Sequence, residues 1–441
     1  MKKVLSILIV VLIISFSLVA CQPAEPQVIT EKVIETVEVE VTKQVEVVKE
    51  VATEPVTIRL SGWAANPQET ALLESILYKF SVAYPDIRVK YEPITGDYLQ
   101  AINTMVATGE EPDVYYLDIA QYPRFVENGV LAPLNDYMTS SGVKTSDFIP
   151  SLMDAFTTDG VVYGIPKDFN SLGMFYNKTL FDNAELDYPT NDWTWDDLKV
   201  AAEKITDVEN NIFGFGVPAD AGRFPTFIFQ NGGSVMSEDF SETLLDSPEA
   251  VAAAEFYTNF RVNSYGATPD QVGEGWQGTA FGKGNFAMVY EGGWLIPYLR
   301  EQFPGIEYGV VNPPAGPAGE GNMVFTVAYV LSPNSKNPEA AWELINFLTN
   351  EQSQTTVLES GFALPTRVVL GESEYLKNNS ASAAIFNGAF EGAKPFVWGI
   401  VGSDVNDQMG KALERVYLEN QNVADSFKLA AEAIRKAIAE Q

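Results

Sequence analysis

The sequence predicts an α/β protein with about two domains, because patterns typical of strands and helices alternate along most of its 441 residues. One such series starts near residue 55, and a second starts after about residue 166. Strands that alternate with helices are typical of sheets with mostly parallel strands. A hydrophobic fraction of 46% is enough to build large packed cores.

The first series predicts three strands and two helices. Residues 69–84 have apolar side chains at helical spacing, and residues 97–109 form a second helical pattern that ends on Gly109, the usual residue after a helix. The predicted strands are VTIRLSGW at 56–63, DIRVKYEPI at 86–94 and DVYYLD at 113–118. The last is apolar enough to lie inside a parallel sheet.

The second series again mixes both patterns. In the helical stretch 193–206, Thr194 is expected to cap the helix, with Asp197 completing a capping box. Two further helices carry proline in the first turn. The predicted strands are 171–178 and 211–217, and the predicted helices are 193–206, 247–260, 337–354, 404–420 and 423–439.

The amino terminus has the features of an export signal. Two lysines precede an aliphatic run over residues 4–14, which is shorter than the roughly 20 residues that a membrane-spanning helix needs. Leu18-Val19-Ala20-Cys21 resembles the bacterial lipobox, in which the cysteine receives lipid and the chain is cut before it. We therefore expect removal of residues 1–20 and a lipid anchor on Cys21 at the bacterial cell membrane, on its outer face or periplasmic side. An uncleaved anchor is the alternative, and the small residues before Cys21 argue against it.

Residues 21–54 are predicted to comprise the lipidated Cys21 and a stalk that follows it. From residue 22 on, the segment contains no aromatic residue or glycine and repeats Val, Glu, Lys and Thr. Its valines fit a helical heptad seam, but they also alternate as in a strand. Both structures stay open, as does self-association of the stalk.

Composition excludes several kinds of activity. The chain has no histidine, which removes catalysis by Ser-His-Asp or Cys-His and most zinc sites. A single cysteine cannot form an intramolecular disulfide. The net charge of −31 would repel phosphate, so we expect no nucleic-acid partner. Paired carboxylates or an oxygen-ligated calcium ion are the chemistry that remains.

Several stretches in order resemble one family. They are YGIPKDFNSLGMFYNKTLFDNAELDYPTNDWTWDDL from residue 163, GKGNFAMVYEGGW from 282, FTVAYVLSPNSKNPEAAWELINFLTNEQSQ from 325, GFALPTR from 361, and the segment around Trp398. Together they are similar to the extracellular solute-binding proteins of ABC importers, in the maltose-binding-like branch called family 1. The likeness runs from about Pro55 to the end.

The resemblance implies the type II periplasmic-binding fold, in which two α/β lobes are joined by a multi-strand hinge and ligand lies in the cleft between them. On that template lobe 1 is 55–165 plus 292–327, and lobe 2 is 166–291 plus 328–441. It implies no enzyme activity. We expect no cofactor and assign no residue to a metal site, and calcium binding stays open. The expected partners are a saccharide and the permease subunits, and the protein is expected to be a monomer.

Tryptophans are the first candidates for ligand contact, because flat rings cover the apolar faces of sugars. Trp193, Trp195 and Trp342 have structural explanations at a helix start or in a helix core. Four tryptophans remain as candidates: Trp63, Trp276, Trp294 and Trp398. Trp63 ends the first strand, on the side where open α/β sheets bind ligands. The resemblance places Trp294 and Trp398 at stacking positions.

Polar candidates would bind the sugar hydroxyls. They are Asp118 and Gln121 after the third strand, Asp168 and Asn170 at the first crossing, Asp220 and Arg223 in a loop, and Glu291 near Trp294. Leu117 stands where maltose-type binders carry a stacking tryptophan, which argues against maltose as the ligand. Alternatives are a polyol or peptide ligand, a two-carboxylate glycosidase and a surface adhesion module.

Overall fold

The computed structural model describes residues 29–37, 45–53, 55–63, 67–95, 97–390 and 392–441. The chain forms two compact units. The first comprises residues 1–57 and 81–88, and the second comprises residues 58–80 and 89–441. The predicted signal peptide and lipid site at Cys21 lie outside the described residues.

The described part of the predicted stalk is a β-hairpin. Strand β1 (Ile29–Val37) pairs antiparallel with β2 (Val45–Thr53), with Ile29 opposite Thr53 and Val37 opposite Val45. Of the two structures that the sequence left open, the strand is therefore the one found in these residues, and the helical seam is not.

One large mixed sheet of ten strands lies almost entirely in the second unit. Along the sheet the order is β10-β9-β11-β8-β13-β5-β3-β4, and β12 and β14 pair with β8 and β13. The strands are β3 (Val56–Trp63), β4 (Ile87–Ile94), β5 (Val114–Asp118), β8 (Gly164–Asn177), β9 (Phe213–Gly216), β10 (Gly266–Ala267), β11 (Phe286–Gly292), β12 (Tyr308–Val311), β13 (Asn322–Leu331) and β14 (Ala393–Pro395). A separate hairpin joins β6 (Thr157–Thr158) to β7 (Val161–Val162).

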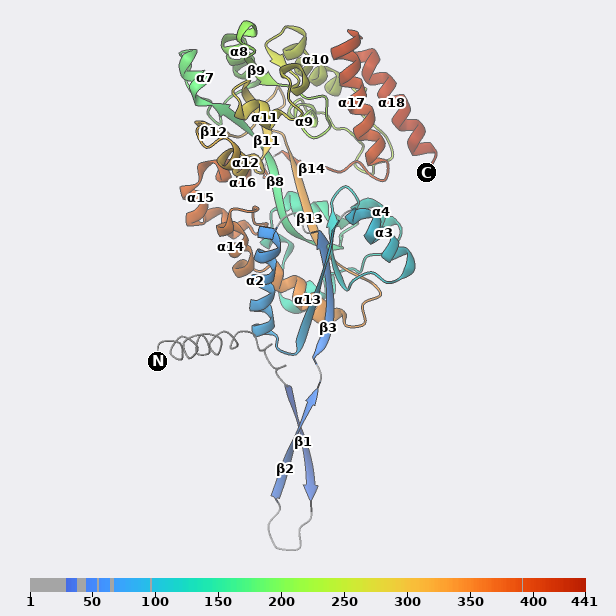
Figure 1. Ribbon diagram of the computed structural model, residues 1–441. Coiled ribbons are helices and arrows are strands. Elements are labelled where there is room, and N and C mark those ends of the chain that lie inside the picture. Colours follow the sequence, from blue (N-terminus) through green and yellow to red (C-terminus); the bar gives the residue numbers. More distant parts are fainter. Residues whose placement is uncertain (1–28, 38–44, 54, 64–66, 96, 391) are drawn as a thin grey trace, which may run out of the picture. The chain divides into compact units, whose positions relative to one another are not determined.

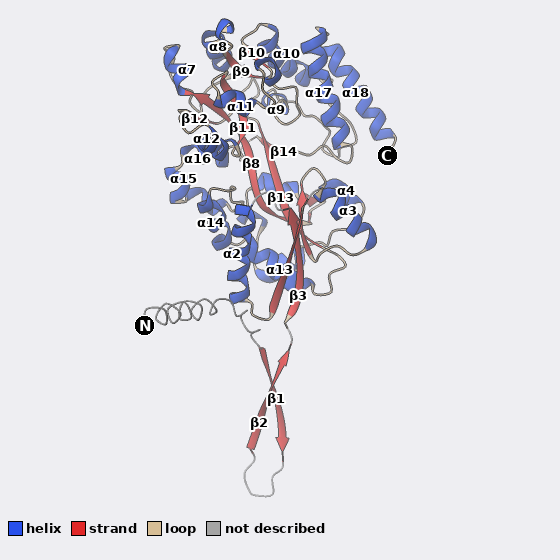
Figure 2. Cartoon of the chain, viewed as in Figure 1, coloured by secondary structure: helices blue, strands red, loops and turns tan. Residues whose placement is uncertain are grey.

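Helices pack around this sheet on both sides (Figure 2). They are α2 (Pro67–Ala83), α3 (Tyr98–Thr108), α4 (Tyr122–Glu127), α5 (Asn135–Ser141), α6 (Pro150–Ala155), α7 (Lys178–Asn183), α8 (Trp195–Ile205), α9 (Pro225–Gln230), α10 (Pro248–Val262), α11 (Gln277–Gly282), α12 (Leu295–Gln302), α13 (Pro338–Leu348), α14 (Glu351–Ser360), α15 (Glu374–Asn378), α16 (Ser380–Asn387), α17 (Gly402–Glu419) and α18 (Val423–Ala439).

The two long strands β8 and β13 form the centre of the sheet (Figure 1). They pair antiparallel with each other, and β8 is also antiparallel to β11 while β13 is antiparallel to β5. Parallel pairing occurs further out, between β3 and β5 and between β9 and β11. The expectation of mostly parallel strands was therefore wrong for the centre, because an apolar run does not encode its direction.

Two groups of elements flank these long strands, and we call them lobes. The first lobe contains β3, β4 and β5 with helices such as α3 and α4, and the second contains β9, β10 and β11 with α8, α10 and α17 (Figure 1). Residues 327–331 of β13 pair with β5 of the first lobe, and β12 pairs with the second-lobe end of β8. We therefore propose that residues 328–348 belong to the first lobe and residues 292–326 to the second, the reverse of the predicted assignment.

Helix α13 also packs against elements of the first lobe. Trp342 stacks on Tyr137 with ring centroids 6.0 Å apart and donates its indole N–H to Ser141 Oγ at 3.1 Å. Phe347 lies edge-on to Phe80 at 5.3 Å. The side chain of Trp342 is buried, which confirms its predicted role in the core.

The helix ends predicted from local sequence signals are confirmed at two places. Gly109 follows α3 with φ 69°, and Thr194 forms a capping box with Asp197 at the start of α8. The predicted helix over 337–354 is instead two helices, α13 and α14. Asn350 separates them because its side chain accepts a hydrogen bond from the Ser353 N–H and so caps α14.

Candidate functional site

The central strand β13 brings two predicted carboxylates together. Val327 pairs with Asp118 of β5 on one side and with Asp168 of β8 on the other. Loss of hydration raises the pKa of Asp118, a hydrogen bond from the Ala120 N–H opposes that shift, and the Asp168 carboxylate raises it further. The two side chains therefore sense each other's charge across the strand.

Trp63 joins this group from the end of β3. Its indole lies edge-on to Tyr98 and Tyr116, with ring centroids 5.3 Å and 5.2 Å away. Trp63, Asp118 and Gln121 line one cavity of about 270 Å³. We call Trp63, Asp118, Gln121 and Asp168 the first-lobe cluster, which unites four predicted residues.

A buried ammonium group contacts one member of the first-lobe cluster, Asp168. Lys167, whose side chain is 12% exposed, pairs with Asp168 and lies 3.8 Å from Glu69 Oε1 at the start of α2. It also sits 4.9 Å from the centre of the Tyr116 ring. Burial alone would lower the pKa of Lys167, but the carboxylates of Asp168 and Glu69 and the Tyr329 side chain raise it overall. Lys167 thus stays charged and neutralises part of the acidic cluster.

Five other predicted residues form one network of hydrogen bonds and ion pairs in the second lobe. Glu291 of β11 is 0% exposed, and its carboxylate accepts hydrogen bonds from Trp276 Nε1 at 2.7 Å and Trp294 Nε1 at 2.6 Å. Arg223 Nη2 donates to both carboxylate oxygens at 2.7 and 2.8 Å. Asp220 Oδ2 lies 3.6 Å from Arg223 Nη1. We call these five residues the second-lobe cluster.

Neighbouring carboxylates stabilise the charged form of Arg223. Burial works against its charged form, but the Glu291 carboxylate, followed by Asp220, raises the pKa of Arg223. Its guanidinium carbon also lies 5.9 Å from the centre of the Trp294 ring. Nη2 is occupied by Glu291, whereas the longer contact of Nη1 with Asp220 leaves room for Nη1 to donate to a ligand hydroxyl.

Asn170 stands between the two clusters. It lies on β8 beside Gly293, where a Cβ atom added to the glycine would come within 2.6 Å of Asn170 Oδ1. Its partner in the ladder is Phe325 of β13, whose ring is edge-on to Trp294 at 5.4 Å. The two long strands therefore carry Asn170 and Phe325 from one cluster toward the other.

Trp398 has surroundings unlike those of the other three candidate tryptophans. Its side chain is only 5% exposed, its indole N–H donates to Asn406 Oδ1 at 2.8 Å, and its ring is edge-on to Phe396 at 5.6 Å. A ligand would reach little more than one edge of this ring.

Four residues with a place in these clusters were not predicted. Gln277 donates to Glu291 Oε1 at 3.1 Å, and Tyr98 lines the cavity beside Trp63. Lys167 and Phe325 are the others. Lys167 directly precedes a predicted residue, and Tyr98 and Phe325 are aromatic. No sequence signal marked Gln277, because it is one polar residue in a short helix.

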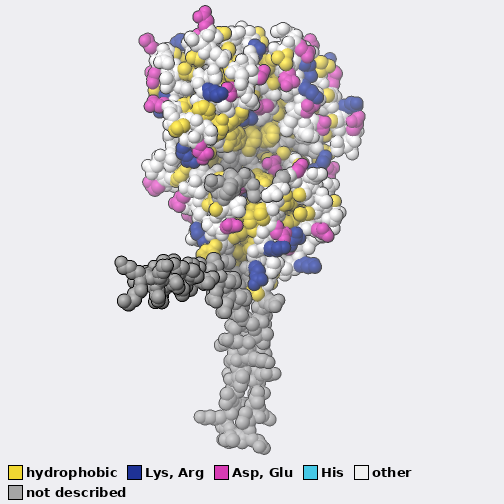
Figure 3. Space-filling view, viewed as in Figure 1, with side chains coloured by type: hydrophobic (Ala, Val, Ile, Leu, Met, Phe, Trp, Pro, Cys, Tyr) yellow, Lys and Arg dark blue, Asp and Glu magenta, His cyan; other side chains and the backbone are white. Residues whose placement is uncertain are grey.

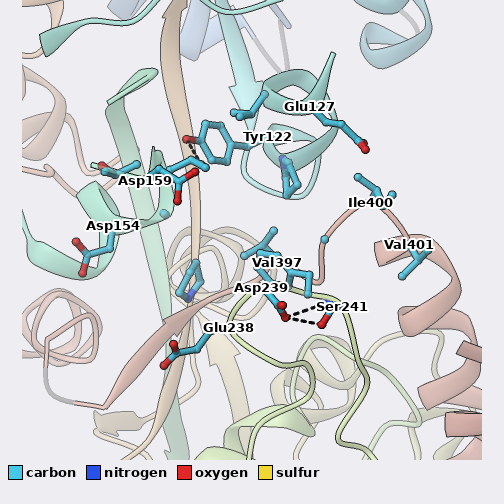
Figure 4. Close-up of a pocket in the computed structure, with 18 of the residues that line it drawn as sticks. Tyr122, Glu127, Asp154, Asp159, Glu238, Asp239, Ser241, Val397, Ile400 and Val401 are labelled. Atoms are coloured by element: carbon cyan, nitrogen blue, oxygen red, sulfur yellow. Dashed lines mark hydrogen bonds between the residues drawn. The ribbon is translucent and has the colours of Figure 1, made fainter. Parts of the chain in front are cut away.

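Figure 3 shows that the face toward the viewer is hollowed between the two lobes, with hydrophobic side chains in the hollow. A larger cavity, of about 760 Å³, is lined from both lobes but by none of the predicted residues (Figure 4). Tyr122 and Glu127 of α4 lie on one side of it, and Asp239, Val397 and Ile400 contribute other walls. Hydrogen bonds from Ser241 and Ser237 lower the pKa of Asp239 to about 2.

This larger cavity lacks the tryptophans expected of a sugar site. Its walls combine aliphatic, acidic and hydroxyl side chains with the rings of Tyr122 and Phe240, and tryptophan is absent from the residues that line it. The two clusters, in contrast, combine indole rings with carboxylate, amide and guanidinium groups. We therefore take the clusters as the candidate site. Among the described residues, no group of three or more His, Cys, Asp and Glu side chains is placed to hold a metal ion.

Comparison with known proteins decides the family. Residues 64–355, more than half of the chain, match the model of the bacterial extracellular solute-binding proteins. The chain belongs to this family. Its members bind solutes and are not enzymes, and the two lobes joined by β8 and β13 have the type II fold of periplasmic sugar-binding proteins.

Individual solute-binding proteins resemble this one over most of its length. The diacetylchitobiose binding protein of Streptomyces coelicolor is 25% identical over 87% of this chain and 90% of its own. A maltooligosaccharide ABC transporter solute-binding lipoprotein of Streptococcus pneumoniae is 25% identical over 70% and 72%. The structure of an ABC substrate-binding protein from Listeria monocytogenes in complex with cycloalternan is 26% identical, covers 88% of this chain and 100% of that one, and has a TM-score of 0.74.

Of the helices in the described part of this solute-binding protein, none is long and apolar enough to cross a membrane.

Proposed function

We propose that this protein is the lipid-anchored substrate-binding component of an ABC importer. It captures a mono- or oligosaccharide between its lobes and delivers it to the permease subunits. The second-lobe cluster carries this proposal, because two indole rings fixed beside a guanidinium group match the apolar faces and hydroxyls of a sugar. The sugars named for related proteins support the same ligand class.

Capture follows from contact with both lobes. Trp63, Asp118 and Gln121 offer a ring, a carboxylate and an amide from the first lobe, and Trp294 and Arg223 offer a ring and a cation from the second. A ligand that contacts both sets stabilises the arrangement that brings them together, since only differential contacts shift such an equilibrium. The permease would then recognise the liganded arrangement of the two lobes.

Calorimetry of the purified protein against a panel of saccharides tests the ligand class. We expect at least one mono- or oligosaccharide to bind with a dissociation constant of about 10 μM or tighter, near −7 kcal/mol or below. Polyols, short peptides and glycerophosphodiesters serve as the comparison set. Binding of one of these, with no saccharide bound, would contradict the sugar assignment.

The anchor is tested separately at Cys21. Cys21→Ser removes the thiol that would carry the lipid, so we expect the variant to leave the membrane fraction or to accumulate with its leader uncut. Gln27→Ala, six residues further on, is the matched control and should stay with membranes. Retention of the Cys21→Ser protein in washed membranes, with a processed amino terminus, would argue against lipid attachment.

A further inference from the structure

We infer that Glu291 is a positioning residue: its buried carboxylate fixes the indoles of Trp276 and Trp294 and the guanidinium of Arg223 before the ligand arrives. The inference rests on the proposed function, because it assigns a role within that binding site. It replaces the predicted direct contact between Glu291 and the ligand.

The hydrogen bonds that the Glu291 carboxylate already accepts exclude a direct contact with the ligand. A carboxylate offers about four lone-pair sites for hydrogen bonds. Glu291 Oε1 already accepts from Trp276, Gln277 and Arg223, and Oε2 accepts from Trp294 and Arg223. The side chain is also 0% exposed. A ligand hydroxyl therefore finds neither an open acceptor nor a path to it.

The partners of Glu291 come from three separate parts of the second lobe. Trp276 directly precedes α11 and Trp294 directly precedes α12, whereas Arg223 lies in the loop before α9. Gln277 is the first residue of α11 and also donates to the Tyr290 carbonyl at 2.7 Å. One carboxylate on strand β11 thus fixes the N–H edge of both rings and the orientation of the Arg223 guanidinium.

Glycines support the rings from behind. A Cβ atom on Gly292 would come within 2.4 Å of the Trp294 ring, and one on Gly278 within 2.4 Å of the Trp276 ring. Each indole therefore approaches a backbone that carries no side chain. Held at its N–H edge by Glu291 and against a glycine, each ring has little freedom left, so its ordering costs little when a ligand binds.

Glu291→Gln tests this account, because it replaces one carboxylate oxygen, an acceptor, with an NH₂ group, a donor. The amide keeps one oxygen but presents N–H groups to a site already filled with N–H donors. At least one indole in Glu291→Gln must then lose its acceptor. Glu274→Gln, which removes a carboxylate paired with Lys283 outside this network, is the matched control.

Indole ¹⁵N–¹H spectra give a readout that does not require a ligand. The seven tryptophans give seven indole signals, and Trp276→Phe and Trp294→Phe identify the two of interest. In Glu291→Gln we expect at least one of these two to move and to exchange its proton faster with solvent. The indoles of three other tryptophans have separate acceptors and serve as internal controls: Trp195 to Gln230, Trp342 to Ser141 and Trp398 to Asn406.

Saccharide affinity is the second readout. We expect Glu291→Gln to weaken binding by roughly 5- to 100-fold, the cost of ordering two or three side chains on binding. Gly292→Ala displaces the Trp294 ring while every charge stays in place, so it covers the case in which Glu291→Gln does not fold. Its expected loss is about tenfold, against none for Gly275→Ala, where an added Cβ meets nothing within 4 Å.

The outcomes separate this inference from the proposed function. Unchanged indole signals and unchanged affinity in both Glu291→Gln and Gly292→Ala would overturn the positioning role while the binding function stands. If the parent protein binds no saccharide, the proposed function fails, and the spectra alone then decide whether Glu291 fixes the indoles. Shifted signals together with weaker binding support both.

Discussion

Trp294→Ala is expected to weaken saccharide binding by about 30- to 1,000-fold, or roughly 2–4 kcal/mol, as at other buried aromatic contacts. Trp294 is partly exposed, its ring is edge-on to Phe325, and its N–H donates to Glu291. Its removal takes away the apolar surface and leaves one hydrogen-bond acceptor of a buried carboxylate unused. Isothermal calorimetry with the best saccharide measures the effect.

Trp342→Phe is the matched control for this prediction. Trp342 is buried in α13 against Tyr137 and takes no part in either cluster. Its replacement should lower the unfolding temperature by a few degrees through the lost hydrogen bond to Ser141, and it should leave the dissociation constant unchanged. Equal affinity of Trp294→Ala and the parent protein would remove the second-lobe cluster from the binding site.

Lys167→Met is expected to lower the free energy of unfolding by about 3–5 kcal/mol, because it leaves buried carboxylates without their cation. Asp168 and Glu69 lie around the lost ammonium group, and Asp118 adds negative charge nearby. Urea denaturation at pH 7 measures the change. Lys90→Met removes an exposed partner of Glu92 and should cost no more than about 1 kcal/mol.

The decrease in the free energy of unfolding caused by Lys167→Met should depend on pH in a defined direction. Burial and the Asp168 carboxylate already raise the pKa of Asp118 in the folded state, and removal of the Lys167 cation takes positive charge away from this acidic cluster. The folded state then binds more protons, so stability is retained at acid pH and falls as the pH rises past the carboxyl range. The gap between Lys167→Met and the parent should therefore be smaller near pH 4 than at pH 7. A constant gap would mean that Lys167 does not neutralise these acids.

Much of the fold could be predicted because it depends on local patterns. Gly109 and the pair Thr194 and Asp197 mark helix ends through contacts within a few residues. The directions of β8 and β13 could not be predicted, since strand pairing depends on partners more than a hundred residues away. The break at Asn350 was missed because one capping side chain outweighed a continuous helical pattern.

The candidate site was predicted as a set of residues but not as two clusters. Residue type and position singled out Trp276, Trp294 and Glu291, yet their shared hydrogen bonds depend on how separate elements pack. The role of Glu291 could not be predicted from the sequence. A glutamate whose acceptor sites are all occupied by protein donors and a glutamate that binds the ligand are the same residue type. Burial of Trp398 likewise follows from packing around α17.

The crystal structure of the protein with its best-binding saccharide tests the central claim most directly. The account predicts sugar density between the clusters, with ring faces against Trp63 and Trp294 and a hydroxyl near Arg223 Nη1. Sugar density in the cavity of Figure 4, away from both tryptophans, would contradict it.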